Sequence, residues 1–248
     1  MLDTVIFSLI KGLPFSIKKK LIEDHKSPKK AIVNLKISLR RVNSKTGLKI
    51  LNQINSNAIV EKAEKIIQEC MESKIQIIPY WDNFYPKDLI HCIDAPFLIY
   101  SKGEQNPNTQ SLISIVGTRN CTDYGLKEIK RILNYLKPYP IGIVSGLAYG
   151  IDIYAHRTAN ELNLVNHAVL GGGINRIYPK KHLEDSQKIK ENGILISEYS
   201  PNEGPRAYHF PRRNRIIAGM SKCTIVIESK KTGGAMITAR LANDYNRD

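Results

Sequence analysis

From Ser111 onward, short apolar runs alternate with stretches whose apolar residues recur at helical spacing. The apolar runs are Leu112–Val116, Ile141–Val144, Ala168–Leu170, Ile194–Ile196 and Thr224–Ile227. The helical stretches are Tyr124–Leu136, Ile151–Glu161, Leu183–Glu191, Arg212–Met220 and Met236–Tyr245. Strands that are apolar throughout are buried on both faces, and repeated strand–helix units connect parallel strands. The alternation therefore predicts an α/β fold with a parallel sheet and helices on both faces.

Polar, glycine-rich loops follow four of these five predicted strands. They are Val116–Asn120, Ser145–Asp152, Gly171–Asn175 and Glu228–Ala235. Glycine permits tight turns and lets backbone amides approach an anion, and the N-terminus of a following helix adds a partial positive charge. Ligands bind at the carboxyl ends of parallel strands, so four such loops on one edge predict a row of phosphate-binding cups.

Other chemistries find little support in the motifs. The loops match neither the G-x-G-x-x-G dinucleotide pattern nor the P-loop pattern. The six histidines show no metal-ligand spacing, so we expect no metal and no cofactor. Ser145, Asp152 and His156 contain the members of a hydrolase triad, but no G-x-S-x-G elbow precedes them. A helix cap and core hydrogen bonds explain these three residues better than an enzyme does.

Net charge points to the partner. Lysine and arginine number 37 against 23 acidic residues, a formal net charge of +14. Eleven basic residues and two acids lie between Lys18 and Lys49, and arginines gather again at Arg206, Arg212, Arg213 and Arg215. Such an excess favours a polyanionic partner. A solvated surface in a lysine-rich chain is the alternative, and it explains the lysines better than the arginines.

Composition bounds the class of protein. Hydrophobic residues make up 42% and charged residues 24%, which are globular values and exclude a disordered chain. No stretch approaches the roughly 18 apolar residues of a membrane span, and no basic segment precedes the first apolar run. The four cysteines lie far apart, without a C-x-x-C pair. We therefore expect a cytoplasmic protein that does not contact membranes.

Three segments are predicted. Residues 1–73 read as a small helical module of the helix-hairpin-helix or SAM-like kind, because helical patterns at Val5–Ile10 and Ile17–Ile22 flank a glycine-containing turn. A further helix is predicted at Ile59–Ser73. Residues 74–110 form a connecting extension, with strands at Ile75–Tyr80 and Asp94–Tyr100 and a polar linker at Ser101–Gln110. Residues 111–248 form the core.

Several longer motifs stand in and around the predicted loops. They are Val116–Arg119, Val144–Asp152 with Ala155-His156, Gly171–Ile174 with Tyr178-Pro179, Ser197–Tyr199, Phe210–Ser221 and Thr232–Ala239. In these motifs the chain resembles the DprA/Smf family of DNA-processing proteins, over about residues 80–248. The pattern departs from the family at Gly234, where many members have serine, and at the end of the chain. The family normally continues beyond Asp248, so we expect a truncated core.

The resemblance implies an extended Rossmann-like fold and a function without catalysis. The function it implies is to bind and protect single-stranded DNA and to load the RecA recombinase during natural transformation. It also implies a homodimer. Two alternatives remain open: a nucleotide-processing enzyme of the LOG phosphoribohydrolase group, and a scaffold without either activity. Against the enzyme, no acid follows the glycines of Thr232–Ala235, where that group pairs a threonine with a glutamate.

The predicted DNA-binding residues come from five loops and one helix. They are Gly117, Thr118, Arg119, Ser145, Gly146, Leu147, Ala148, Gly171, Gly172, Lys180, Arg212, Arg213, Asn214, Arg215, Thr232, Gly233 and Gly234. We expect Arg119 to reach one phosphate. The backbone amides around Gly117–Arg119 and Ser145–Gly146, with the Ser145 hydroxyl, should hold the next. One of Arg212, Arg213 and Arg215 is expected to be structural. Base stacking is worth about 1–3 kcal/mol per base. Its candidates are Tyr149, Tyr178, Tyr208 and Phe210.

Overall fold

The computed structural model describes residues 1–41 and 44–248 and begins with a helical module. Its helices are α1 Leu2–Leu9, α2 Phe15–His25, α3 Pro28–Arg40, α4 Lys45–Asn55 and α5 Asn57–Glu72. In the turn between α1 and α2, the Lys11 amide donates to Gln53 Oε1 at 2.9 Å, and Gln53 Nε2 donates back to the Lys11 carbonyl. The Lys11 backbone is therefore engaged within the module.

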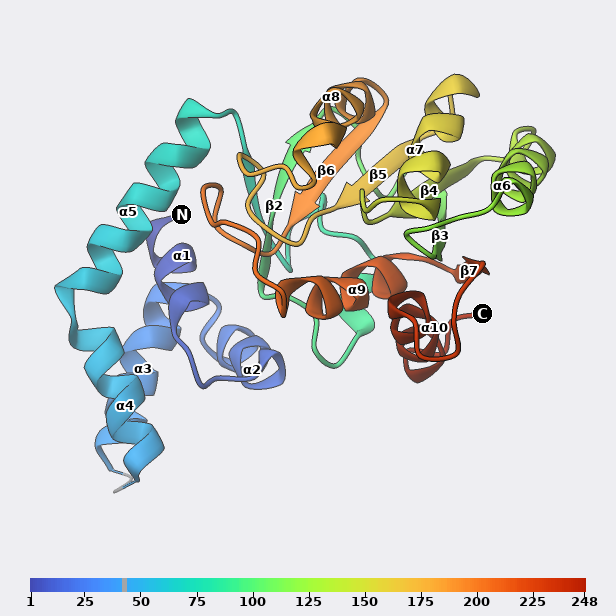
Figure 1. Ribbon diagram of the computed structural model, residues 1–248. Helices are drawn as coiled ribbons and strands as arrows, with labels where there is room; N and C mark the ends of the chain where they lie inside the picture. Colours follow the sequence, from blue (N-terminus) through green and yellow to red (C-terminus); the bar gives the residue numbers. More distant parts are fainter. Residues whose placement is uncertain (42–43) are drawn as a thin grey trace.

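A single mixed sheet organises the rest of the described chain (Figure 1). Its strands are β1 Gln76–Pro79, β2 Leu98–Gly103, β3 Ser111–Gly117, β4 Ile141–Ser145, β5 Asn166–Val169, β6 Gly193–Ser197 and β7 Cys223–Ile227. Their spatial order is β1-β2-β6-β5-β4-β3-β7. The five strands from β3 to β7 are parallel to one another, with Val116 opposite Val226, as the alternating pattern predicts.

Two antiparallel strands that the sequence analysis assigned to the connecting extension join the sheet at one side. β2 pairs antiparallel with β6, Tyr100 lying opposite Ser197, and β1 pairs antiparallel with β2. β2 also extends to Gly103, into the segment predicted as a polar linker. These two strands cover the edge of β6, which would otherwise present unpaired backbone groups.

Helices cover both faces of the sheet. They are α6 Asp123–Leu136, α7 Ile151–Glu161, α8 Leu183–Glu191, α9 His209–Met220 and α10 Gly234–Asp244, with short 3₁₀ turns η1 Leu89–His91 and η2 Lys180–His182. α6, α7 and α8 lie on one face, and α9 and α10 on the other (Figure 1). The chain therefore passes from one face to the other at β6, between α8 and α9.

Consecutive residues of β3 serve opposite cores, because side chains alternate across a strand. Ile115 packs with Ile129 of α6 and Ile151 of α7 in one cluster. Val116 belongs to the other cluster, which includes Ile216 of α9. That second core continues into the helical module, so the module and the sheet share one apolar interior.

One charged side chain lies in this shared interior. Lys18 of α2 is only 6% exposed, and its Nζ donates to the Ser8 carbonyl at 2.8 Å. The ammonium lies 5.9 Å from the ring centre of Phe7 and 5.6 Å from that of Phe97. Burial lowers the pKa of Lys18 to about 8. The basic excess of the N-terminal segment is therefore not entirely a solvated surface.

We expect Lys18→Met to stabilise the protein below pH 8. The folded state binds the Lys18 proton more weakly than the unfolded state does, with a pKa of about 8 against 10.5, so native stability rises between these pH values. The pH-dependent part amounts to about 3 kcal/mol. Chemical denaturation at pH 7 and pH 10 measures it. An advantage of the methionine variant that does not shrink at pH 10 would contradict this assignment.

Candidate nucleic-acid interface

The loops after the parallel strands meet along one rim of the sheet. β3 lies between β4 and β7, so the strand order reverses there, and such a switch point is where open α/β sheets bind ligands. Thr118 after β3 donates its N–H to the Glu228 carbonyl after β7 at 2.7 Å. The Thr118 carbonyl accepts from the Ile151 amide at the start of α7, at 3.1 Å. As predicted, the loops share one edge.

Arg213 stands inside this rim as a buried support. It is 4% exposed, and its guanidinium donates to the carbonyls of Gly146 and Val169. A β-carbon at Gly146 would collide with the guanidinium, so glycine is required for this contact. Burial raises the pKa of Asp152, and the positive charge of Arg213 counteracts this increase. The prediction that Arg213 and Gly146 contact DNA is therefore replaced by a structural role.

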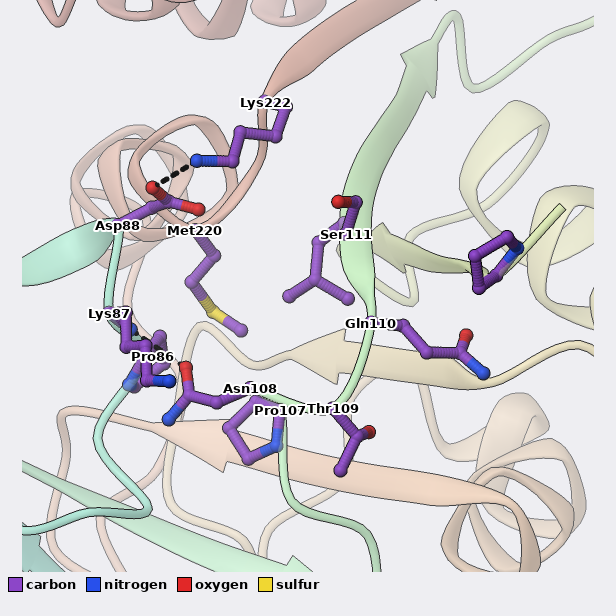
Figure 2. A pocket seen from close by; sticks show the side chains of 12 residues that line it. Pro86, Lys87, Asp88, Pro107, Asn108, Thr109, Gln110, Ser111, Met220 and Lys222 are labelled. Carbon is purple, nitrogen blue, oxygen red and sulfur yellow. Dashed lines mark hydrogen bonds and ion pairs between the residues drawn. The ribbon is translucent and has the colours of Figure 1, made fainter.

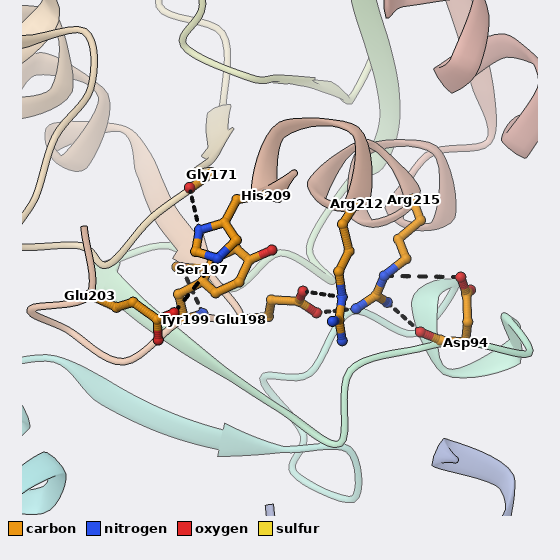
Figure 3. Close-up of polar contacts among 9 residues, drawn as sticks. All are labelled: Asp94, Gly171, Ser197, Glu198, Tyr199, Glu203, His209, Arg212 and Arg215. Atoms are coloured by element: carbon orange, nitrogen blue, oxygen red, sulfur yellow. Dashed lines mark hydrogen bonds and ion pairs between the residues drawn. The ribbon is translucent and has the colours of Figure 1, made fainter. Parts of the chain in front are cut away.

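Arg215 is also held within the protein (Figure 3). It donates to the Glu198 carboxylate and to the Asp94 carbonyl. Glu198 also forms an ion pair with Arg212, whose Nε lies 2.9 Å from Glu198 Oε1. Arg212 remains exposed, whereas Arg215 is buried. Two of the three arginines are thus structural, where the sequence predicted one.

The predicted phosphate contact of Ser145 is wrong. The hydroxyl is fully buried and donates to the Ile115 carbonyl at 2.6 Å. His156 is equally buried, with Nδ1 2.6 Å from Asn166 Oδ1 and with Nε2 accepting from the Leu147 amide. Ser145 and His156 therefore have different partners. Ser145 and His156 support the loop, and their contacts are not those of a Ser-His-Asp triad.

Three further predicted residues, Leu147, Gly171 and Gly172, are buried. The carbonyl of each accepts a hydrogen bond from another side chain. His182 Nδ1 donates to the Leu147 carbonyl at 2.8 Å, and Ser197 Oγ donates to the Gly172 carbonyl at 2.7 Å. Gly171 accepts from the buried His209. His182, Ser197 and His209 therefore hold the backbone of the rim loops in place. The predicted residues that stay partly or fully exposed are Gly117, Thr118, Arg119, Ala148, Lys180, Arg212, Asn214, Thr232, Gly233 and Gly234.

Arg119 is exposed beside a pair of aromatic rings. Its guanidinium carbon lies 6.0 Å from the ring centre of Phe210, and the Phe210 and Tyr178 rings lie 5.6 Å apart. Phe210 packs where a β-carbon on Gly171 would otherwise stand. Tyr178 is 52% exposed, so its side chain is accessible to a ligand. A cation for a phosphate thus adjoins an aromatic surface for a base.

One predicted anion cup already contains an anion. The Glu228 carboxylate accepts from the Thr122 amide at 2.8 Å and from the Thr122 hydroxyl, at the N-terminus of α6. A negative charge is favoured at that end of a helix. The Glu228 carboxylate therefore occupies the N-terminus of α6, a position that also suits a phosphate.

The sequence analysis did not identify three residues that support the rim: Glu198, His182 and His209. Each lies within or close to a motif or a predicted DNA-binding residue, but nothing in the local sequence reveals its long-range partner. The one available signal was Glu198 itself, an acid at the end of an otherwise apolar strand, as a counter-charge to the arginines of α9.

A cavity of about 390 Å³ lies away from the rim, at the end of the sheet where β3 and β4 begin (Figure 2). Ser111 and Pro140, which line it, stand at the start of β3 and just before β4. Lys222 Nζ lies there 2.7 Å from Asp88 Oδ1. This cavity does not coincide with the arginine and the aromatic rings of the rim.

Within residues 1–41 and 44–248, no group of three or more histidine, cysteine, aspartate or glutamate side chains stands where it could hold a metal ion. Over the same residues, none of the helices combines the length and the apolar character that crossing a membrane requires.

The buried histidines predict acid lability. Burial lowers the pKa of His156 to about 4 and that of His167 to about 3. The unfolded chain binds these protons near pH 6.5 and the folded protein does not, so stability falls as pH drops below 6.5. At pH 5 we expect a loss of about 4 kcal/mol. NMR titration of the folded protein tests this: if either imidazole gained a proton above pH 5, the explanation would fail.

Fold and rim together define a class: Rossmann-like proteins whose ligand edge carries exposed arginine and aromatic side chains in place of a nucleotide fingerprint. The model of the family described as DNA recombination-mediator protein A matches residues 76–248. The chain belongs to this family.

Individual relatives agree with this membership. DNA processing protein DprA of Streptococcus pneumoniae is 35% identical over 197 residues, 78% of this chain and 70% of that protein. Protein Smf of Escherichia coli is 37% identical over 173 residues, 69% of this chain but only 46% of that protein. The chain thus spans less than half the length of this relative.

Solved structures agree in fold. The X-ray structure of DprA from Streptococcus pneumoniae matches with a TM-score of 0.84 and 29% identity, over 100% of this chain and 85% of that chain. The structure of DNA processing protein A from Helicobacter pylori, which concerns that protein's single-stranded DNA binding mode, matches with a TM-score of 0.63 and 27% identity. It covers 70% of this chain and 78% of that chain.

Proposed function

We propose that this protein binds single-stranded DNA along the rim and acts in DNA processing as a binding protein without catalysis. One observation carries the proposal: exposed Arg119 beside the Phe210–Tyr178 pair, at the switch point of the sheet. The guanidinium suits a phosphate, and the rings suit an unpaired base. Family membership and the single-stranded DNA binding mode studied in the Helicobacter pylori relative support the same ligand.

The proposed contacts avoid sequence preference. Phosphates lie on every nucleotide, and every base has a face that stacks on an aromatic ring. Lys180 and Lys181 are exposed next to Tyr178 and extend the positive charge of the rim. Thr118, Asn214 and the Thr232–Gly234 loop stay proposed contacts, because they border the rim and are at least partly exposed.

The wider role rests on the family. We infer that the bound strand is protected and handed to the RecA recombinase, in natural transformation or a related recombination route, and that two copies of the chain associate. The family description, a recombination mediator, supports this inference. The nucleotide-enzyme alternative loses support, because the Glu228 carboxylate is engaged by Thr122 instead of facing Thr232.

Fluorescence anisotropy with a labelled oligonucleotide tests the proposal. We expect single-stranded DNA to bind more tightly than the same sequence as a duplex, because stacked pairs hide the base faces. Neutralising about three phosphates through Arg119, Lys180 and Lys181 gives a log–log salt slope of about −2. Equal affinity for duplex and single strand, or turnover of nucleoside monophosphates, would contradict the proposal. RecA capture by the tagged protein checks the wider role separately.

A further inference from the structure

α7 is the central helix of its face, and it exposes few side chains. Between Ile151 and Glu161, the exposed residues are Tyr154, Arg157 and the terminal Glu161. Tyr154 is 37% exposed, and the side chain of Arg157 is 46% exposed. A tyrosine and an arginine thus lie one turn apart on an otherwise buried helix.

These two side chains repeat the arrangement of the rim. The guanidinium carbon of Arg157 lies 6.0 Å from the ring centre of Tyr154, the distance that also separates Arg119 from Phe210. Asp185 of α8 fixes the Arg157 guanidinium by two hydrogen bonds, from Nε at 2.8 Å and from Nη2 at 3.0 Å. Since Asp185 neutralises the charge of Arg157, the pair presents a planar surface more than a free cation.

The pair is continuous with the rim. The Tyr154 amide donates to the carbonyl of Gly150, the last residue of the loop after β4. The two positions are four residues apart, about 6 Å along the helix axis. Tyr149 of the same loop is 41% exposed and packs edge-on against His182 at 5.0 Å. The exposed Lys180 and Lys181 precede that histidine and supply positive charge beside this path.

We propose that Tyr154, held by Arg157, is a second stacking subsite for an unpaired base, where a longer single strand leaves the rim over α7. Tyr149 lies between the two subsites, and Lys180 and Lys181 attract the phosphates. This inference rests on the proposed function and extends it: the rim alone accommodates a short oligonucleotide, and the α7 subsite adds affinity only for a longer one.

Oligonucleotide length separates the two ideas. We expect Tyr154→Ala to weaken binding of a 20-nucleotide oligothymidylate by roughly fivefold or more and to leave a 6-nucleotide one unchanged, with Tyr154→Phe close to native. Tyr135→Ala is the matched control, because Tyr135 is an exposed tyrosine at the end of α6. Native affinity of Tyr154→Ala for both lengths, or equal loss at both, would overturn the subsite.

A second readout does not depend on affinity. A 20-nucleotide strand with 5-iodouracil near one end, photocrosslinked and analysed by mass spectrometry, should label the peptide that contains Tyr154. Labelling confined to peptides of the rim, or to another exposed helix face, overturns the α7 path while leaving the proposed function intact. If the native protein binds neither length, the proposed function itself fails, and the subsite fails with it.

Discussion

We expect Arg119→Ala to weaken the binding of a short single-stranded oligonucleotide by roughly 10- to 100-fold. A charge-assisted hydrogen bond contributes about 1.5–3 kcal/mol, and each 1.4 kcal/mol is tenfold in affinity. The variant also loses the guanidinium that lies 6.0 Å from Phe210. Because one phosphate is no longer neutralised, the salt slope becomes shallower by about 0.7. Anisotropy titrations at several salt concentrations measure both effects.

Two variants separate position from net charge. Arg131→Ala removes the same charge from an exposed site on α6, where Arg131 pairs with Glu128, and should bind almost as the native protein does. Arg119→Lys keeps the charge but loses the planar group, so we expect an intermediate affinity. If Arg119→Ala and Arg131→Ala bound equally well, net charge alone would explain binding, and the assigned rim would be wrong.

Arg213→Met is expected to lower the free energy of unfolding by about 2–6 kcal/mol, because two buried carbonyls lose their donor at a cost of about 1–3 kcal/mol each. Arg213 is 4% exposed, so the variant leaves the carbonyls of Gly146 and Val169 without their donor. It also leaves Asp152 buried without a counter-charge. Denaturant unfolding measures the loss.

The neighbouring arginine provides the control for this experiment. Arg212→Met removes an exposed side chain and should cost less than about 1 kcal/mol. Adding Asp152→Asn to Arg213→Met should recover part of the lost stability, since the double variant no longer buries a carboxylate that lacks a partner. Equal unfolding midpoints for Arg212→Met and Arg213→Met would show that Arg213 does not support the rim.

The architecture of the core follows from general rules and was predictable. Apolar strands that alternate with helices form parallel sheets, and the carboxyl ends of parallel strands lie on one edge. The loops at Gly117, Gly146 and Gly171 therefore had to meet. The direction of β1 and β2 was not predictable, because an apolar strand reads the same whether its neighbour is parallel or antiparallel.

Which of the α9 arginines are buried and which is exposed also could not be predicted from the sequence. Arg212, Arg213 and Arg215 are close neighbours on one helix, and their burial depends on how α9 rotates against the sheet. It depends equally on Glu198 and Asp94, which come from other elements. The burial of Lys18 was unpredictable for the same reason. A lysine in a basic segment gives no sign that the rings of Phe7 and Phe97 will lie beside it.

A crystal structure with a bound oligothymidylate tests the central claim most directly. We predict one phosphate at the Arg119 guanidinium, an adjacent base against Phe210 or Tyr178, and no contact between DNA and the buried Arg213 and Ser145. A DNA strand bound instead across the helical module would contradict the account. So would one bound in the cavity beside Ser111 and Pro140, at the end of the sheet away from the rim.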